Sequence, residues 1–345
     1  MTEPDRSALT RGLERPPAES YDAALLDLDG VVYVGPAAVP HAVDALAAAR
    51  KVGMRLAFVT NNASRTPQAV AAHLRELGIP ADADEVATSA QAAARIVAEL
   101  VPPGSAVLVV GGAGLEQAVV DRGLHPVRVY DSQVAALVQG YHPTVAWTHL
   151  AEGTFAVRGG VPWIASNTDL TIPTPRGIAP GNGTLVNVIR TATGVDPIVA
   201  GKPELALHAE SAERVGARHP LVVGDRLDTD ILGADRAGAD SLLVLSGVTD
   251  AAELLAAPPD RRPTFLSADL RGLLRPHDPV AATDEGIAVG GWFASVRDGR
   301  LELTGDGVLS EGLRAACVAW WANPGDHLAP ALRRLEKCRS EQADG

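Results

Sequence analysis

Short apolar runs alternate with amphipathic helical patterns along most of this chain. Helical patterns cover residues 41–51 and 67–77, and Thr66 and Pro67 suit the start of the second helix. Strands this short and apolar are buried on both faces, so the alternation predicts an α/β fold with parallel sheets covered by helices. The strand-like runs lie at residues 23–26, 56–60, 107–110, 144–147, 163–165, 221–223 and 241–245.

The composition bounds the classes of function. The chain has 345 residues, enough for two or three domains, and its formal net charge of −12 disfavours nucleic acid and anionic membranes as main partners. Its two cysteines, Cys317 and Cys338, predict neither a disulfide framework nor a zinc cluster. No apolar stretch approaches the roughly 18 residues of a membrane span, and the polar first twenty residues do not resemble a signal peptide. We therefore expect a cytoplasmic protein.

Two carboxylates follow the first apolar run directly. Asp27 and Asp29 come at the end of residues 23–26 and precede Gly30. Carboxylates this close together at the end of a buried strand repel each other, and a divalent cation would offset the repulsion. Because Asp and Gly also open ordinary turns, this motif by itself is as typical of a turn as of a metal site.

Two further groups of polar residues occur later in the chain, outside the predicted helices. Thr60, Asn61 and Asn62 come after the run 56–59 and suit the oxygens of a phosphate, although an ordinary turn would use the same residues. Lys202 is one of only three lysines, and no helix explains its place. It could neutralise a phosphate, but Pro203 stands where a P-loop requires Ser or Thr.

A second acidic motif follows the run 221–223. It supplies Asp225, Asp228 and Asp230, and carboxylate oxygens favour Mg²⁺ over zinc. All four polar sites lie at the carboxyl ends of presumed parallel strands, where open α/β sheets bind ligands. Together they predict a magnesium site beside a phosphate site.

The ordered motifs DLDGVVYVG, TNN, GKP and GDRLDTDI resemble those of the haloacid dehalogenase-like phosphatases. The resemblance is to the subfamily of NagD, the nitrophenylphosphatases, pyridoxal phosphatase and the phosphoglycolate and glycerol-phosphate phosphatases. It covers about residues 21–274. It implies a Rossmann-like parallel-sheet core, and Mg²⁺-dependent hydrolysis of a small phosphomonoester through an aspartyl-phosphate.

The resemblance also implies roles for the acidic residues. Asp27 would be the nucleophile, and Asp29 would protonate the leaving alkoxide and then activate water. Asp27, the carbonyl of Asp29 and Asp225 would bind Mg²⁺, with Asp230 as a further ligand or as support.

By the same resemblance, Thr60, Asn61, Asn62 and Lys202 would hold the phosphoryl group. Elementary electrostatics agrees, because a carboxylate attacks a phosphate dianion only when their repulsion is cancelled. Mg²⁺ and Lys202 can supply that cancellation.

The spacing of the motifs predicts a lid domain. Thr60 lies 33 positions after Asp27, but Lys202 lies 142 positions after Thr60, far more than one crossover needs. We predict a core formed by residues 18–83 and 181–274, and an α/β cap at residues 84–180. Such a cap would exclude water and favour small substrates.

The cap contains a false nucleotide motif. The run 107–110 leads into Gly111-Gly112-Ala113-Gly114, but Gln117 occupies the place of the third glycine, so no dinucleotide cofactor is expected. The segments 166–176 and 181–183 are the expected specificity surface.

The last part of the chain, residues 283–345, is predicted to be a small α+β module after a linker near 275–282. Runs at 292–296 and 300–303 flank Arg297-Asp298-Gly299, a hairpin signal. A helix is expected from Ser310, with its apolar face formed by Leu313, Cys317, Trp320 and Trp321. The module resembles a fragment of an acetyltransferase-like fold that lacks a glycine-rich loop for acetyl-CoA. A packing or dimerisation role is expected.

The predicted substrate is glycerol 3-phosphate, ahead of 2-phosphoglycolate and of nucleotide or sugar phosphates. One alternative is a phosphotransferase such as a mutase, although mutases of this superfamily usually carry their cap between the first two motifs. A second alternative is a phosphometabolite sensor with a decayed site, against which the intact set of motifs argues. A homo-oligomer formed through the cap or the C-terminal module would be compatible with either role.

Overall fold

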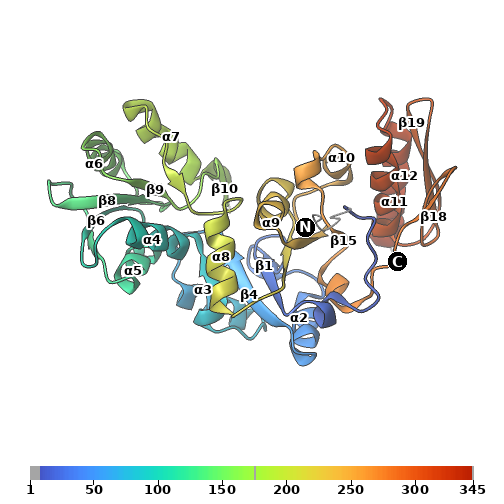
Figure 1. The fold of residues 1–345 in the computed structure, drawn as a ribbon, viewed down its shortest axis with the longest axis horizontal. Helices are drawn as coiled ribbons and strands as arrows, with labels where there is room; N and C mark the ends of the chain where they lie inside the picture. The colour runs from blue at the N-terminus through green and yellow to red at the C-terminus, as the bar shows by residue number, and fades with distance from the viewer. Residues whose placement is uncertain (1–7, 175, 344–345) are drawn as a thin grey trace, which may run out of the picture. The chain divides into compact units, whose positions relative to one another are not determined.

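The computed structural model describes residues 8–174 and 176–343 (Figure 1). The chain divides into two compact units, one made of Met1–Leu56 with Ala217–Gly345 and the other of Ala57–Gly216. This division does not follow the domain bounds expected from the sequence, which stay a prediction. Among the described residues, no helix is both long and apolar enough to cross a membrane.

The first unit contains a run of neighbouring parallel strands with buried apolar side chains. Leu26 of the first strand lies opposite Val223, so the carboxyl ends of these two strands meet at one edge. The parallel α/β architecture is thereby confirmed. In sheet order the strands are β15 (Phe265–Ser267), β14 (Asp240–Val244), β13 (Pro220–Gly224) and β1 (Ala23–Asp27).

Helices cover both faces of these strands, as buried parallel strands require. Figure 1 shows α9 and α10 above the strands and α2 below them. A short hairpin, β2 (Tyr33–Val34) with β3 (Ala37–Ala38), follows β1. The helical segments are α1 (Pro17–Ser20), α2 (Ala42–Lys51), the π-helical turn η2 (Leu227–Ile231), α9 (Leu232–Ala237), α10 (Ala251–Leu255), and the 3-10 turns η3 (Pro259–Arg261) and η4 (Leu270–Leu274).

The C-terminal part of the first unit is an antiparallel meander followed by two helices. The predicted hairpin is present, and Asp298 and Gly299 at its turn have φ angles of 50° and 71°, as a two-residue hairpin turn requires. The predicted helix from Ser310 is also present. The elements are β16 (Ala281–Thr283), β17 (Gly286–Val289), β18 (Trp292–Arg297), β19 (Arg300–Gly305), α11 (Leu309–Ala322) and α12 (Ala329–Ala343).

This C-terminal part shares one apolar core with the parallel strands. Trp292 and Cys317 are buried in the same cluster as Leu243 of β14 and Leu254 of α10. The Trp321 indole N–H donates to the Leu255 carbonyl at 3.1 Å. The C-terminal residues therefore complete the core of the first unit, as the expected packing role implies.

A second attachment runs through the start of the chain. From α11, the buried Arg314 guanidinium donates to the carbonyls of Leu9, at 2.6 Å, and Arg11, at 3.3 Å. Arg11 in turn pairs with Asp240 at the start of β14. The N-terminal segment thus ties α11 to the parallel strands.

The second unit begins within β4 (Arg55–Thr60), which pairs in parallel with β5 (Val86–Thr88). As predicted, Thr66 caps the helix α3 (Pro67–Glu76), because its hydroxyl accepts the Ala69 N–H at 3.3 Å. The 3-10 turn η1 (Ala83–Glu85) precedes β5. Thr88 and Gln91 form a reciprocal capping box at the start of α4 (Ser89–Leu100).

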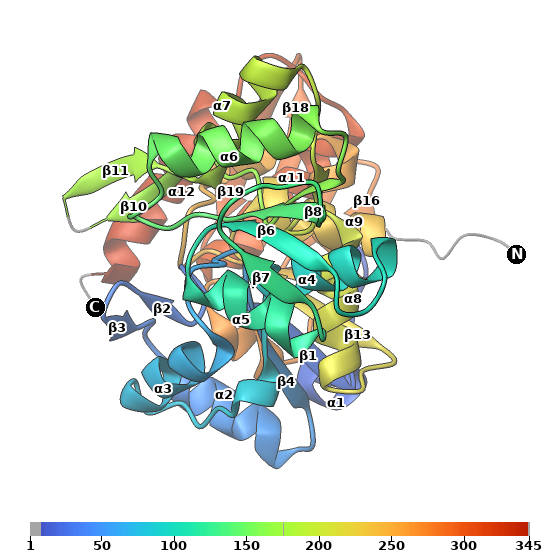
Figure 2. The same cartoon turned by 90° about the vertical axis from the view of Figure 1, so that its left-hand side faces the viewer.

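A five-stranded parallel sheet with helices on both faces makes up most of the rest of this unit. Figure 2 shows α6 and α7 on one face of it and α4 and α5 on the other. Its strands in sheet order are β12 (Ile198–Val199), β9 (Trp163–Ala165), β8 (Val134–Gln139), β6 (Ala106–Val110) and β7 (His125–Val127). The remaining elements are α5 (Ala113–Asp121), α6 (Trp147–Arg158), the hairpin β10 (Thr171–Thr174) with β11 (Gly177–Pro180), α7 (Asn182–Thr193) and α8 (Leu205–Arg214).

One predicted strand is wrong. Residues 144–146 form a mostly exposed loop, and Trp147 begins α6 with 76% of its surface exposed. The Ala146 N–H donates to His149 Nδ1 at 3.0 Å, which starts the helix there. The expected strand is replaced in the sheet by β8, which the sequence patterns missed.

The false nucleotide motif has a packing explanation. Gly114 lies in the first turn of α5, and a Cβ at this position would lie 2.6 Å from the Arg65 carbonyl oxygen and 2.7 Å from that of Ala63. Close approach of two backbones therefore requires this glycine.

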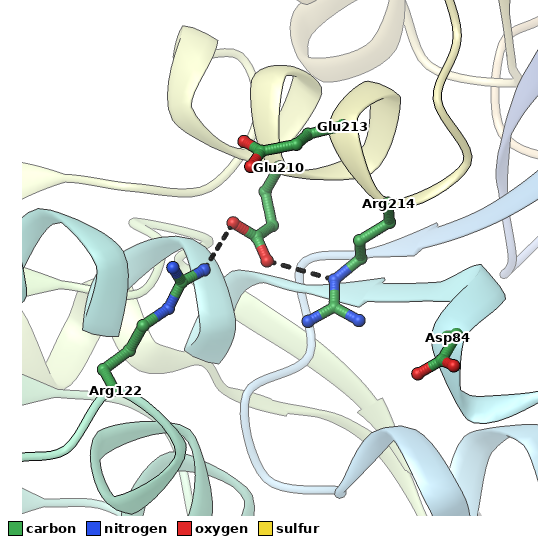
Figure 3. A pocket seen from close by; sticks show the side chains of 5 residues that line it. All are labelled: Asp84, Arg122, Glu210, Glu213 and Arg214. Carbon is green, nitrogen blue, oxygen red and sulfur yellow. Dashed lines mark hydrogen bonds and ion pairs between the residues drawn. The ribbon is translucent and has the colours of Figure 1, made fainter.

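A buried carboxylate braces α8 within the second unit (Figure 3). Glu210, with 4% of its side chain exposed, accepts from Arg122 at 2.8 Å and from Arg214 at 3.0 Å. Arg95 of α4 lies 3.6 Å away. A buried charge is stable only when it is paired, so this network ties α8 to α4 and to the end of α5.

Replacing this carboxylate tests the brace. We expect Glu210→Ala to lower the free energy of unfolding by about 1–3 kcal/mol, because partly buried guanidinium groups lose their partner. Glu213→Ala is the matched control: its carboxylate is 71% exposed, and its loss should cost less than about 1 kcal/mol. Urea unfolding followed by circular dichroism measures both, and equal losses would contradict the brace.

Removal of the C-terminal residues tests the shared core. A chain ending at Leu274 would expose the apolar groups of β15 and α10 that α11 contacts. We expect a lower unfolding midpoint, or a change of oligomeric state, measured by calorimetry and size-exclusion chromatography with light scattering. An unchanged midpoint and mass would show that these residues form an independent unit.

Candidate active site

Three carboxylates converge at one edge of the first unit. Asp27 ends β1, Asp225 follows β13, and Asp230 lies in the turn η2. Each offers an oxygen within 4.8 Å of the oxygens of the other two, and Asp225 and Asp230 are buried. The parallel pairing of β1 with β13 explains the convergence, because it brings both strand ends to the same edge.

The buried carboxylates are held by the main chain. Asp225 Oδ2 accepts the Val248 N–H at 2.7 Å, and Asp230 Oδ2 accepts the Arg226 N–H at 3.1 Å. A Cβ at Gly30, whose φ is 84°, or at Gly247 would collide with the Asp225 carboxylate. These two glycines leave room for a buried charge at the strand ends.

Asp29 is placed differently from the three converging carboxylates. Its side chain is exposed, in a tight loop where the N–H groups of Val32 and Tyr33 both donate to the Leu28 carbonyl. An exposed carboxylate can exchange protons with solvent, as the acid and base role implied for Asp29 requires.

Asp228, the middle carboxylate of the second acidic motif, binds its neighbour. Arg226 contacts it through two parallel hydrogen bonds, at 3.1 Å and 2.9 Å. Burial raises the pKa of Asp228, but the Arg226 guanidinium outweighs burial and lowers that pKa below its usual value. Asp228 therefore lies outside the group of converging carboxylates formed by Asp27, Asp225 and Asp230.

The donor set of this group fits Mg²⁺. Three carboxylates within a few ångströms repel one another, and a hard divalent cation is the partner that oxygen ligands prefer. Asp27, Asp225 and Asp230 are the residues that would hold it.

Neutralising one carboxylate tests the metal site. We expect Asp225→Asn to weaken Mg²⁺ binding at least about tenfold, because one of the converging charges is lost while the Val248 contact can persist. Asp228→Asn is the control and should change the affinity less than about twofold, since Asp228 pairs with Arg226. Isothermal titration with Mg²⁺ alone measures both, and equal changes would contradict the assignment.

The polar residues of the TNN and GKP motifs meet in the second unit. Asn61 follows the last residue of β4 and hydrogen-bonds the backbone of Lys202, which is buried after β12. Thr60 Oγ1 accepts the Asn62 N–H at 3.1 Å, and Asn62 Oδ1 accepts from Ser64. The turn that the sequence also allowed is thus formed by Asn62, whose phosphate contact stays a prediction.

Three further residues join this polar group. The hydroxyl of Ser89 and the amide of Asn167 each donate to the Asn61 carbonyl at 2.6 Å, and Asp169 accepts from the Asn61 amide. Asn167 and Asp169 belong to the segment predicted to set specificity. Ser89 had no signal in the sequence, because only the pairing of β4 with β5 brings it to the end of β4.

Three family descriptions match this chain. Residues 24–125 match the haloacid dehalogenase-like hydrolase family, and residues 199–273 match a HAD-hydrolase-like model. Residues 289–335 match a GCN5-related N-acetyltransferase-like domain, which agrees with the likeness found for the C-terminal module.

Individual relatives match over most of the chain. A D-glycerol 3-phosphate phosphatase from Mycobacterium tuberculosis is 44% identical, over 88% of this chain and 87% of its own length. An acid sugar phosphatase from Staphylococcus saprophyticus is 36% identical, over 74% of this chain and 98% of its own length. A crystal structure of a glycerol phosphate phosphatase from Mycobacterium tuberculosis in complex with magnesium matches with a TM-score of 0.84 and 43% identity, covering 93% of this chain and 99% of that one.

The chain belongs to the haloacid dehalogenase-like hydrolases, as its motifs, fold and relatives agree. Within that family these relatives are phosphatases, and the predicted enzyme class, a hydrolase of phosphoric monoesters, is confirmed. The magnesium of the matching crystal structure agrees with the predicted cofactor.

Proposed function

We propose that this chain hydrolyses glycerol 3-phosphate with Mg²⁺, through an aspartyl-phosphate formed on Asp27. The observation that carries the substrate is the extent of the match with the D-glycerol 3-phosphate phosphatase. That match leaves about an eighth of the chain uncovered, less than the length of residues 283–345, so it reaches into the C-terminal module. The match with the acid sugar phosphatase leaves about a quarter uncovered.

In the proposed first step, an oxygen of the Asp27 carboxylate attacks phosphorus. The bond from phosphorus to the glycerol oxygen breaks, and Asp29 gives its proton to that oxygen. Mg²⁺, when bound, supplies positive charge that lowers the repulsion between the carboxylate and the phosphate dianion. Thr60, Asn62 and Lys202 are proposed to hold the remaining phosphoryl oxygens, with Asn61 bound to the backbone of Lys202 beside them.

In the second step, water attacks phosphorus and Asp29 takes its proton. The bond between phosphorus and Asp27 breaks, which releases inorganic phosphate and restores the Asp27 carboxylate and the protonated Asp29. Splitting the reaction in this way lets one exposed carboxyl group serve both halves.

The other parts of the proposal follow the expected organisation. Residues 84–180 are proposed to be a cap that restricts access to small phosphomonoesters, and the segments 166–176 and 181–183 to contact the substrate. A cytoplasmic location and a homo-oligomer stay predictions.

The match with the acid sugar phosphatase supports a second candidate, a sugar-phosphate phosphatase. The two candidates share the chemistry of the metal site and differ in the alcohol that leaves. Substrate profiling separates them.

Phosphate release from a panel of phosphorylated metabolites, with Mg²⁺ or with EDTA, tests the proposal. We expect Mg²⁺-dependent release that is fastest with glycerol 3-phosphate, and a loss of at least about 10³-fold in kcat for Asp27→Asn with substrate binding retained. Fastest release from a sugar phosphate or from 2-phosphoglycolate would overturn the substrate. Appreciable activity of Asp27→Asn would overturn the nucleophile.

A further inference from the structure

The side-chain amide of Asn61 is fully engaged inside the second unit. Its Oδ1 accepts the Lys202 N–H at 2.8 Å. Its Nδ2 donates to the Lys202 carbonyl at 3.2 Å and to the Asp169 carboxylate, at 3.2 Å to Oδ2 and 3.4 Å to Oδ1. An asparagine amide has two N–H donors, and these two acceptors use both.

The neighbours of this amide fix its orientation. A flipped amide would turn its oxygen toward two acceptors, the Lys202 carbonyl and the Asp169 carboxylate, and would lose the Lys202 N–H. The hydrogen bond to a carboxylate is also stronger than one between neutral groups. The Asn61 amide therefore hydrogen-bonds both the N–H and the carbonyl of Lys202 in a single orientation.

Close packing around Gly201 supports the same arrangement. A Cβ at Gly201 would lie 2.6 Å from Asn61 Oδ1 and 2.5 Å from the Ser166 carbonyl oxygen. Only glycine lets the chain reach Asn61 one residue before Lys202. The hydrogen bonds between Asn61 and Lys202 thus explain the glycine of the GKP motif.

Asp169 links the hydrogen-bonded pair Asn61 and Lys202 to the segment between β9 and α7. Its N–H donates to Asn167 Oδ1 at 3.2 Å, and its carbonyl accepts the Gly183 N–H at 2.8 Å at the start of α7. The Asn182 amide donates to the Asn167 carbonyl at 2.7 Å. The hairpin β10–β11 begins two residues after Asp169.

We infer that Asn61 and Asp169 are a positioning pair, which sets the place of Lys202 and couples it to the segment that precedes the β10–β11 hairpin. The side chain of Asn61 then acts on the phosphoryl group through Lys202. This differs from the direct contact that the family resemblance implies for it. The inference rests on the proposed function, because it takes Lys202 as the residue that meets the phosphoryl group.

An exchange of the two side chains tests the pair. Asn61→Asp places a carboxylate oxygen against the Asp169 carboxylate and the Lys202 carbonyl, so we expect kcat/KM to fall about 100-fold. Asp169→Asn alone should lose less, since its amide oxygen can still accept from Asn61. In the double variant, the amide introduced at position 169 can donate to the carboxylate introduced at position 61. We expect the double variant to recover about tenfold over Asn61→Asp.

The binding of inorganic phosphate, measured by calorimetry in Mg²⁺, should follow the same order and show the same recovery. Asn62→Asp is the matched control, because Asn62 Oδ1 bonds Ser64 and Asp169→Asn should not rescue it. Lys202→Ala gives the loss of kcat/KM and of phosphate binding that is expected when the positioned ammonium group itself is missing.

The outcomes separate the pair from the function. If the wild-type enzyme releases phosphate but the double variant binds it no better than Asn61→Asp, the positioning pair is wrong and the proposed function stands. Equal rescue of Asn62→Asp by Asp169→Asn would also overturn the pair. If the wild-type enzyme releases phosphate from neither glycerol 3-phosphate nor p-nitrophenyl phosphate, both fall together.

Discussion

The repulsion among Asp27, Asp225 and Asp230 is the constraint on which the first unit depends. Three carboxylates whose oxygens lie within 4.8 Å of one another, two of them buried, oppose folding unless opposite charge or hydrogen bonds offset them. The chain meets this constraint with main-chain N–H groups from Arg226 and Val248 and with glycines that leave the carboxylates room. Mg²⁺ is the natural complement of what remains.

Much of the fold was predictable because it depends on local patterns. Apolar runs mark β1 and β13, and the alternation with helices predicts their parallel pairing, so the sequence alone places Asp27 and Asp225 at one edge of the sheet. Residues 144–147 were mistaken for a strand because their apolar side chains resemble those of β8, whereas Trp147 is exposed on a helix. Periodicity does not show which short apolar run is buried.

The details of the site were less predictable because they depend on tertiary contacts. Sequence alone could not show that Asp228 pairs with Arg226 while Asp230 turns toward Asp27. Nor could it show that the Asn61 amide faces the Lys202 backbone and Asp169, residues 141 and 108 positions away. Such hydrogen bonds form between segments whose separation in sequence gives no signal.

The first unit is made of segments from both ends of the chain, and this limits the order in which the protein can fold during synthesis. Residues 57–216 are continuous and can fold while synthesis proceeds, whereas β1 has no β13 beside it until residue 224 has been made. Arg314, which donates hydrogen bonds to the carbonyls of Leu9 and Arg11, is synthesised later still. Asp27 therefore meets Asp225 and Asp230 only after about two thirds of the chain has been made, so the group of three carboxylates cannot form early in synthesis.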